Sequence, residues 1–335
     1  MQKNYNFTVS VAPMMDWTDR HCRWFHRKLS KNILLYTEMV VAEAIIYGDK
    51  DFLISYNTEE HPVALQLGGS NPQKLSRAAK IGEQFGYDEI NINIGCPSDR
   101  VQSGRFGACL MREPELVADC YAAIKNTVDI PVTVKCRLGV DRQNVSETLP
   151  HFIETVSRSG CEHFIIHARK AWLNGLSPKE NRSIPPLQYS MVHEIKKQFS
   201  NLEIILNGGL KNILDAKNNS IGLDGVMFGR AAYQNPWFLT KVDKSFYEEP
   251  VFTEGRDDLV EDLIRYAELK QDSDRSTKSL IRHIMGLYTG QIGARAWRRA
   301  LSEGISNGLK PSKIIKKAAE EVDKTKNILK VNYDA

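Results

Sequence analysis

Eight short runs of β-branched and apolar residues recur along the first 231 residues of this 335-residue chain, each ending at a polar or glycine-rich boundary. Strands that are apolar throughout and alternate with helices indicate a parallel sheet covered by helices. Eight such units, without the GxGxxG turn of a dinucleotide-binding sheet, predict an α/β fold, the (β/α)8 TIM barrel. The runs span 7–15, 33–40, 62–69, 89–97, 130–139, 163–169, 203–209 and 225–231. The gaps with helical spacing of apolar residues include 71–86, 113–128, 146–160 and 187–200.

The pattern changes at residues 240–258, a polar stretch that predicts an interdomain connection. Helical patterns follow, without a strand pattern among them, and they predict a small helical bundle. We therefore expect two domains, a catalytic barrel over residues 1–242 and a helical domain over residues 255–335. The expected helices span 257–272, 276–290, 293–303 and 311–327.

Charge is distributed unevenly between these two parts. Residues 275–335 contain 13 Lys or Arg against 5 Asp or Glu, a net charge of +8, while residues 1–274 carry a net charge of −4. A basic segment on a mildly acidic body is typical of a surface that contacts a polyanion. A merely solvated helical surface would have the same composition, so charge alone leaves both readings open.

The sequence also indicates the compartment of the protein. Its first residues, MQKNYNFTVSVAPMMDW, lack the basic-then-apolar pattern of an export signal, and no window approaches the 18 or so apolar residues of a membrane span. The six cysteines are scattered without CxxC pairs, at Cys22, Cys96, Cys109, Cys120, Cys136 and Cys161. We therefore expect a cytoplasmic protein with reduced thiols, no membrane contact and no metal site.

Polar and glycine residues stand at the carboxyl ends of the predicted strands. Barrels of this type build their sites from those ends and from the loops that follow. So many such residues together predict a functional site at one mouth of the barrel. The strand-end positions hold these residues together with two methionines: Met14, Met15, Glu38, Gln66, Asn93, Cys96, Lys135, Arg137, His167, Arg169, Asn207, Gly208, Gly209, Gly229 and Arg230.

The last two units point to an anionic ligand. The sequence NGG at 207–209 and the pair Gly229–Arg230 supply backbone amides that can approach an anion, followed by a fixed positive charge. This is where (β/α)8 barrels commonly bind a phosphate. Lys135, Gln66 and His167 suit a flavin ring, whose reduced anion is stabilised by a positive charge. A Schiff-base aldolase that uses Lys135 is the competing hypothesis.

Cys96 lies between Gly95 and Pro97 at the end of the fourth run. A free cysteine in a turn often serves only as a small apolar residue. Beside a phosphate-binding mouth, a rigidly held thiol is instead a good general acid for a reaction that adds hydride to one carbon of a double bond. We therefore predict that Cys96 is the catalytic acid.

Several motifs resemble those of the tRNA-dihydrouridine synthase family. The resemblance spans the barrel and continues into the helical region, and the block at 167–187 is similar to the A-type bacterial branch of the family in particular. The matching motifs are APMMDWTD (12–19), NINIGCPSDRV (91–101), FGACLM (106–111), PVTVKCRLG (131–139), IIHARKAWLNGLSPKENR (165–182), NGG (207–209), GRAAYQNPW (229–237) and GARAWRRALSEG (293–304).

The resemblance implies reduction of the C5=C6 bond of uridines in the D-loop of tRNA, at positions 20 and 20a, by FMN that is reduced again by NADPH, with NADH as the alternative reductant. Hydride would pass from N5 of reduced FMN to C6, and Cys96 would protonate C5. The implied FMN contacts are Pro13, Met14, Met15, Gln66, Lys135, His167, Asn207, Gly208, Gly209, Gly229 and Arg230. The implied contacts to the base and the tRNA are Asn93, Arg137, Arg169, Lys170, Arg182, Arg295, Arg298 and Arg299.

The expected partner is therefore tRNA, and the expected oligomeric state is a monomer. A flavin-dependent reductase of a small enone or free pyrimidine is the alternative function, although it needs no basic helical surface. A non-catalytic RNA-binding barrel is a third hypothesis, which the set of Cys96, Lys135 and His167 disfavours. Lys313, Lys316 and Lys317 share a helix face in the same way as the arginines, and a solvated face explains them equally well.

Overall fold

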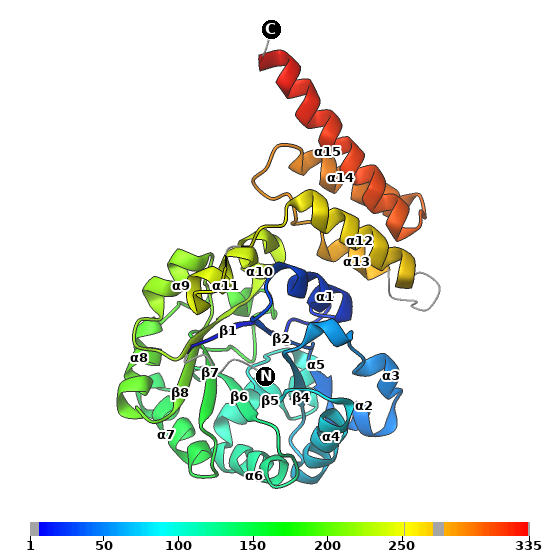
Figure 1. The fold of residues 1–335 in the computed structure, drawn as a ribbon. Coiled ribbons are helices and arrows are strands. Elements are labelled where there is room, and N and C mark those ends of the chain that lie inside the picture. Colours follow the sequence, from blue (N-terminus) through cyan, green and yellow to red (C-terminus); the bar gives the residue numbers. More distant parts are fainter. Residues whose placement is uncertain (1–6, 251, 271–277, 334–335) are drawn as a thin grey trace. The chain divides into compact units, whose positions relative to one another are not determined.

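A closed parallel barrel forms the first part of the chain. The computed structural model describes residues 7–250, 252–270 and 278–333 (Figure 1). Each strand pairs with its neighbours in chain order, and β9 pairs with β1 while β2 pairs with β4, so the sheet closes. The predicted (β/α)8 barrel is confirmed. Its strands are β1 (Thr8–Val11), β2 (Leu34–Tyr36), β4 (Val63–Gly68), β5 (Glu89–Ile94), β6 (Val132–Arg137), β7 (His163–His167), β8 (Glu203–Asn207) and β9 (Gly225–Phe228).

Helices surround this barrel (Figure 1). The short strand β3 (Val40–Val41) adds to β4 at the carboxyl end of the latter. All four helices expected between the strands are present, within a few residues of the expected bounds. The helices of the barrel unit are α2 (Ala42–Tyr47), α3 (Lys50–Leu53), α4 (Pro72–Phe85), α5 (Asp99–Ser103), α6 (Pro114–Lys125), α7 (Val145–Ser157), α8 (Tyr189–Gln198) and α9 (Ile213–Asn219). The 3-10 turns are η1 (Thr58–Glu60), η2 (Gly107–Arg112) and η3 (Glu180–Arg182).

Local chemistry sets the ends of these helices. Asn71 caps α4 by accepting a hydrogen bond from the backbone N–H of Lys74, and Gly86, at φ +94°, ends the helix in the left-handed region. Asn144 caps α7, because its Oδ1 accepts a hydrogen bond from the backbone N–H of Ser146 and the helix starts at Val145.

Strand alternation divides the side chains of β5 between two environments. Ile90, Ile92 and Ile94 point outward, and all three are buried under the surrounding helices. The alternate residues face the interior of the barrel. Much of that interior is an apolar cluster of Ala12, Tyr36, Ala64, Ile165, Ile205 and Met227, against which Met14 and Leu34 pack. The polar residues of β4, β5 and β6 complete the interior, and they include the site residues described below.

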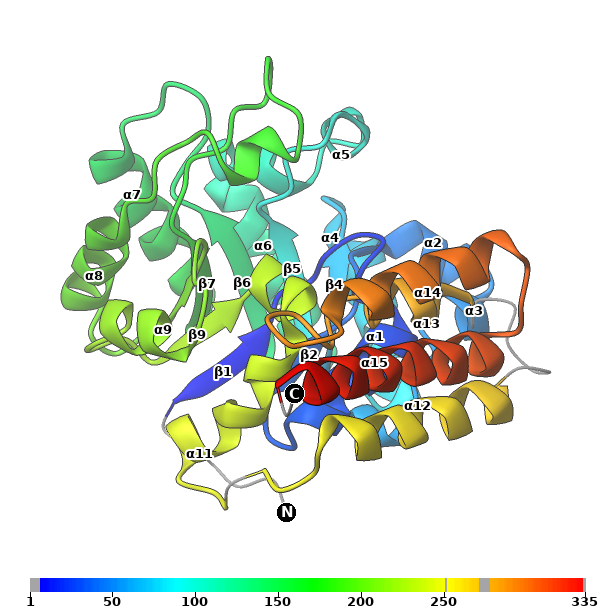
Figure 2. The same ribbon diagram turned by 90° about the horizontal axis from the view of Figure 1, so that it is seen from above.

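The C-terminal helices form a second compact unit together with α1 (Arg20–Leu29). Figure 2 shows α12 and α15 of this unit side by side. No helix among the described residues is long and apolar enough to cross a membrane. The unit also contains α10 (Arg230–Gln234), η4 (Pro236–Lys241), α11 (Val242–Tyr247), α12 (Arg256–Lys270), α13 (Lys278–His283), α14 (Ala294–Ser306) and α15 (Pro311–Tyr333).

Two of the expected C-terminal helices differ from the structure in extent. The helix expected over 276–290 ends at His283 and is followed by turns. A Cβ at Gly286 would lie 2.7 Å from the backbone oxygen of Gln234, so the chain passes there at a distance that only glycine permits. Residues 271 and 272 of the first expected helix, and 276 and 277 of the second, lie outside the described residues.

The two compact units are not divided at a single point of the sequence. The barrel unit comprises residues 1–16 and 32–229, and the helical unit comprises residues 17–31 and 230–335. Asp19, just before α1, accepts hydrogen bonds from Ser279 and His283 at 2.8 and 2.9 Å. In α1 itself, the ring of Trp24 stacks on Tyr266 with centroids 3.9 Å apart. These contacts join α1 and the residue before it to helices more than 240 residues later.

Candidate functional site

The loop after β5 holds the Cys96 thiol in a defined position. Asn93 Oδ1 accepts hydrogen bonds from the backbone N–H groups of Gly95 and Cys96, both at 3.0 Å. The Cys96 thiol donates to Ser98 Oγ at 3.5 Å and is partly exposed. On the far side of the loop, the N–H of Ala108 donates to the Cys96 carbonyl at 2.9 Å. The thiol is therefore presented at the carboxyl end of a strand by backbone contacts on both sides.

The buried thiols of this unit have a different environment. Burial raises the pKa of Cys120 and of Cys136 to about 12, and it also raises the pKa of Cys161. Cys136 is fully buried and points away from Lys135 and Arg137, behind the sheet, as its place in the strand predicts. These thiols are inert at neutral pH, because only the thiolate is reactive.

Lys135 lies within hydrogen-bonding reach of the residue that begins the NGG sequence. Its ammonium donates to Asn207 Oδ1 at 3.0 Å, and Asn207 Nδ2 donates to the backbone oxygen of Met227 at 2.8 Å. Burial, followed by the nearby Arg137 guanidinium, lowers the pKa of Lys135 to about 8. A lysine of this kind suits either an anionic cofactor or Schiff-base chemistry, so its pKa alone does not separate the two hypotheses.

The glycines after β8 adopt conformations that other residues reach only with strain. Gly208 has φ +109°, and a Cβ there would lie 2.5 Å from His167 Cδ2. Gly209 has φ +73°, and a Cβ there would lie 2.4 Å from Leu187 Cδ1. The hydroxyl of Tyr189 donates to the Gly208 carbonyl at 2.7 Å, which holds this turn beside the end of β7. The turn therefore requires glycine at both positions.

Gly229 follows β9 and, unlike Gly208 and Gly209, is not crowded by neighbouring side chains. A Cβ added there would meet no described atom within 4 Å. By strand alternation Gly229 shares its face with Met227, whose side chain belongs to the interior cluster of the barrel. Open space thus lies at the end of β9 on the interior side. Arg230, the next residue, is partly exposed and begins α10 in the helical unit.

The other predicted site residues of β1 and β4 are also at strand ends. Pro13 and Met14 are partly buried just after β1, while Met15 is 53% exposed. Gln66 is buried inside the barrel, and its amide bonds to Asn91 and Asn93 on β5, both at 2.7 Å. Neither the interior residue Asn91 nor its neighbour Thr133 was singled out from the sequence. Their only signal was that they share a strand face with Asn93 and Lys135.

Arg137 is placed differently from a surface phosphate contact. Only 4% of it is exposed, and its guanidinium donates to the backbone oxygens of Gly95, Lys170 and Asn181 at 2.9 to 3.2 Å. Burial, with Arg182 and Arg169 nearby, lowers its pKa to about 10. Arg137 thus ties the Cys96 loop to the long loop after β7.

That long loop carries the remaining predicted contacts of the barrel unit. Arg169 donates to the backbone oxygens of Ser183 and Pro185, while Lys170 Nζ donates to the Gln143 carbonyl at 2.7 Å. Arg182 is exposed. Inside the loop, the fully buried side chain of Asn181 bonds to backbone groups of Trp172 and Leu176.

The loop is also attached to the Cys96 segment. Gln102 Nε2 donates to the carbonyls of Pro97 and Leu173 at 2.9 and 2.7 Å. Neither Asn181 nor Gln102 was predicted as a site residue, because a role in folding a loop leaves no pattern in the sequence. Together with Arg137, these side chains make the two loops one connected rim at the carboxyl ends of β5, β6 and β7.

In the helical unit, three predicted arginines share one face of α14. Arg295, Arg298 and Arg299 are all exposed, at i, i+3 and i+4, and Arg299 lies 3.9 Å from Glu303. Lys313, Lys316 and Lys317 on α15 are exposed as well. Both sets belong to the helical unit, and a polyanion could contact either of them.

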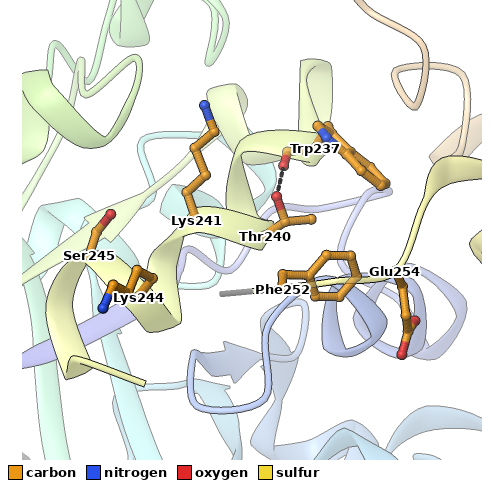
Figure 3. A pocket seen from close by; sticks show the side chains of 7 residues that line it. All are labelled: Trp237, Thr240, Lys241, Lys244, Ser245, Phe252 and Glu254. Atoms are coloured by element: carbon orange, nitrogen blue, oxygen red, sulfur yellow. Dashed lines mark hydrogen bonds between the residues drawn. The ribbon is translucent and has the colours of Figure 1, made fainter. Parts of the chain in front are cut away.

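A hollow of about 390 Å³ lies elsewhere in the helical unit (Figure 3). The ring of Trp237 meets Phe252 edge-on at 6.0 Å, and Arg256 lies over Trp237 at 4.1 Å. Figure 3 shows Lys241 and Lys244 pointing away from each other, so they do not converge on one ligand. The hollow is lined by Trp237, Thr240, Lys241, Lys244, Ser245, Phe252 and Glu254.

The strand ends fit FMN by the chemistry of their donors. A lysine ammonium, a buried glutamine amide and a histidine lie at this mouth, beside a glycine turn whose backbone passes close to His167. The open space at Gly229 leaves room for a ligand close to the backbone. Among the described residues, no group of three or more His, Cys, Asp or Glu side chains could hold a metal ion.

The dihydrouridine synthase family model matches residues 10–325, nearly the whole chain. The chain belongs to the dihydrouridine synthase family. Members of this family are flavin-dependent oxidoreductases that reduce uridine to dihydrouridine in tRNA, so the chain is an enzyme of that class. The predicted family and reaction class are thereby confirmed, and the Schiff-base hypothesis for Lys135 is set aside.

Curated relatives of the dihydrouridine synthase family cover almost the same length. The tRNA-dihydrouridine(20/20a) synthase of Vibrio parahaemolyticus is 52% identical over 96% of this chain and 98% of the relative. The enzyme of the same name from Shewanella oneidensis is 53% identical over 96% and 95%, respectively. The one from Escherichia coli O6:H1 is 54% identical over 89% and 90%. The chain is thus similar to these enzymes over most of its length.

A solved structure with a related fold is a 2-naphthoyl-CoA reductase in complex with 2-naphthoyl-CoA. The TM-score is 0.53 at 13% identity, and the match covers 72% of this chain. This chain spans about half the length of that reductase, at 51%. At such low identity the likeness concerns the fold alone.

Proposed function

We propose that this protein reduces the C5=C6 bond of uridine to 5,6-dihydrouridine in the D-loop of tRNA, at positions 20 and 20a, with FMN as cofactor and NADPH as reductant. The observation that carries the proposal is the Cys96 thiol, presented by Asn93 at the mouth of the barrel. Support for the positions comes from relatives named tRNA-dihydrouridine(20/20a) synthase that are 52–54% identical.

FMN would be held by residues of the barrel mouth. Lys135 would place a positive charge beside the ring, Gln66 and His167 would offer polar contacts, and the turn at Asn207, Gly208 and Gly209 would receive the phosphate side. Pro13, Met14, Met15 and Gly229 would pack against the cofactor. When bound and reduced by NADPH, FMN supplies the hydride that adds to C6 of the uracil ring.

Cys96 would complete the reduction by donating the proton of its thiol. The C4 carbonyl of uracil makes C6 the electrophilic end of the double bond, so the proton must be delivered at C5. The S–H bond of Cys96 breaks as the new C5–H bond forms, which leaves a thiolate. Because the thiol is partly exposed, solvent can return the proton before the next turnover. Ser98 Oγ, 3.5 Å away, holds the thiol in place meanwhile.

The target base must leave its stack in folded tRNA to reach a barrel mouth, and polar groups must replace the contacts it loses. We propose that the rim around Asn93, Arg137, Arg169, Lys170 and Arg182 receives it. Arg182 is exposed on this rim and would contact phosphate. The buried Arg137, already bonded to three carbonyls, would act mainly by holding the rim together. A monomer in the cytoplasm, where six free cysteines stay reduced, fits this role.

A visible absorbance spectrum of the purified protein tests the proposal as a whole. We expect an oxidised-flavin spectrum that bleaches under anaerobic NADPH and recovers when unmodified tRNA is added. Recovery with free uridine at the same rate as with tRNA would instead indicate a small-molecule reductase. A protein that cannot be reconstituted with FMN would contradict the cofactor assignment.

The arginine face of α14 should contribute salt-dependent affinity for tRNA. Phosphate contacts release counterions, so replacing Arg295, Arg298 and Arg299 by glutamine should weaken tRNA binding and lower the magnitude of the salt slope by about two. The measurement is the tRNA dissociation constant between about 50 and 200 mM salt. A matched variant, with Lys313, Lys316 and Lys317 replaced by glutamine, loses the same charge on α15. It shows whether the loss of three charges anywhere in the helical unit lowers the salt slope. Equal slopes in both variants and the wild type would exclude a tRNA contact at α14.

Two glycine variants should separate folding from cofactor binding. Gly208→Ala forces a Cβ against His167 at φ +109°, so we expect a loss of stability of about 1–3 kcal/mol. Gly229→Ala meets open space and should fold normally, but its methyl group should weaken FMN binding about tenfold. Thermal unfolding of the flavin-free proteins and FMN titration measure the two effects. A Gly208→Ala protein with the thermal stability of the wild type would disprove the strained turn.

A further inference from the structure

A series of hydrogen bonds runs from the Cys96 loop into the interior of the barrel. At its upper end, Asn93 Oδ1 accepts from the backbone N–H groups of Gly95 and Cys96, both at 3.0 Å. Asn93 Nδ2 donates to Gln66 Oε1 at 2.7 Å, and Gln66 Nε2 donates to Asn91 Oδ1 at 2.7 Å. Both amides of the Gln66–Asn91 pair are buried, at 1% and 0% exposure.

The series continues to a carboxylate at the first residue of β5. Asn91 Nδ2 donates to Thr133 Oγ1 at 2.7 Å, and the Thr133 hydroxyl donates to Glu89 Oε1 at 2.6 Å. The same oxygen accepts from the Tyr36 hydroxyl at 2.6 Å. We call the connected side chains Asn93, Gln66, Asn91, Thr133 and Glu89 the relay.

The two ends of the relay fix its direction. Backbone N–H groups can only donate, so Asn93 must turn Oδ1 toward the Cys96 loop. Glu89 Oε1 accepts from the hydroxyls of Tyr36 and Thr133. The Thr133 hydroxyl therefore donates to Glu89 and accepts from Asn91. Each amide between these ends then has one orientation, because a flipped amide would set two donors or two acceptors against each other in a buried place.

We propose that Thr133 and Glu89 are positioning residues for the reaction: through the relay they set the orientation of the Gln66 amide and keep Asn93 Oδ1 on the Cys96 loop. The inference deepens the proposed function and rests on it, since Gln66 and Cys96 are its cofactor and catalytic residues. Neither Thr133 nor Glu89 belongs to the expected cofactor or substrate contacts. Thr133 and Glu89 would affect the site only through the side chains of Asn91, Gln66 and Asn93, which lie between.

The critical change is Thr133→Val, which removes the hydroxyl at almost constant shape. Asn91 Nδ2 then has no acceptor in a buried place. If the Asn91 amide flips, its NH2 group faces the NH2 group of Gln66, and flipping Gln66 in turn sets its NH2 group against that of Asn93. Amide hydrogen exchange of a peptide covering Gly95 and Cys96 reports this in the flavin-free protein. We expect its exchange rate to rise about tenfold and the FMN dissociation constant to rise about tenfold as well.

Three further variants make the test specific. Thr133→Ser keeps the hydroxyl and should restore both values to those of the wild type. Glu89→Gln keeps an acceptor oxygen at the same place and should change either value less than threefold. Ser10→Ala removes another buried barrel hydroxyl, one whose Oγ has no hydrogen-bond partner in the described part of the chain, and should change neither value.

Exchange at residues 145–157 of α7 serves as the internal reference for general loosening of the fold. Wild-type exchange and FMN affinity in Thr133→Val would overturn the proposal, as would failure of Thr133→Ser to restore them. If every variant failed to bind FMN, the wild type included, the exchange data would still decide the relay. In that case the cofactor assignment would fail separately.

Discussion

Replacing Cys96 by alanine should abolish most dihydrouridine formation, with turnover lowered by a factor of about 10²–10⁴, the usual contribution of a positioned general acid. The fold should persist, because the backbone N–H of Cys96 donates to Asn93 Oδ1 and its carbonyl accepts from the N–H of Ala108, and neither bond involves the thiol. FMN content and tRNA affinity should therefore match those of the wild type. The measurement is single-turnover reduction of tRNA, with the flavin reduced beforehand.

Cys109 offers a matched control for this variant. It is also a partly exposed thiol of the barrel unit, and it donates to the Phe106 carbonyl at 3.2 Å. Cys109→Ala should retain the turnover of the wild type. Dihydrouridine formation at an undiminished rate in Cys96→Ala would remove Cys96 from the role of proton donor.

The second large effect concerns Lys135 and pH. In the flavin-free protein its pKa is lowered to about 8, mainly by burial, so the ammonium is lost as the pH rises through that value. An anionic cofactor binds the protonated form better, and the FMN phosphate is already ionised in this range. The FMN dissociation constant should therefore be constant below about pH 7.5 and rise toward tenfold per pH unit above pH 8.

Lys135→Met should weaken FMN binding by about 100-fold at pH 7. A lost hydrogen bond to a charged group costs about 1.5–3 kcal/mol, which corresponds to a loss of affinity of this size. It should also abolish the rise between pH 8 and 9.5, because no titrating ammonium remains. Lys170→Met is the control, since Lys170 donates to the Gln143 carbonyl and is not among the expected cofactor contacts. A pH profile unchanged by Lys135→Met would mean that another group controls cofactor binding.

The strands of the barrel could be predicted because each carries its signal locally. A run such as 89–97 is apolar at every second residue, stops at glycine and proline, and is followed by a helical pattern. The residues at its end could be predicted as site residues because fold geometry brings all strand ends to one mouth. Cys96 and Lys135 thus follow from position along the strand and from the chemistry of the side chain.

Contacts between distant segments could not be predicted in this way. Grouping α1 with the C-terminal helices depends on Asp19 and Trp24 meeting residues more than 240 positions later, and no local pattern encodes that pairing. The burial of Arg137 could not be predicted either, because its acceptors are carbonyls of loops whose folding depends on Asn181. Arg137 shows that a charged residue at a strand end can hold neighbouring loops together.

The interior polar residues were missed for a related reason. Thr133 and Asn91 lie in the middle of strands, where barrels usually carry branched apolar side chains. Alternation places them on the inner face, but only the structure shows that five polar groups there satisfy one another. A polar residue at such a place is costly unless it is bonded, so the complete series is informative about the site.

The most direct test of the central claim is the position of the product in tRNA. Unmodified tRNA would be incubated with the purified protein and NADPH, digested, and analysed by mass spectrometry for the 2 Da that each dihydrouridine adds. We predict the added mass at positions 20 and 20a of the D-loop and nowhere else in the molecule. Product at other uridines, or reduction of free uridine without reduction of tRNA, would contradict the proposed function.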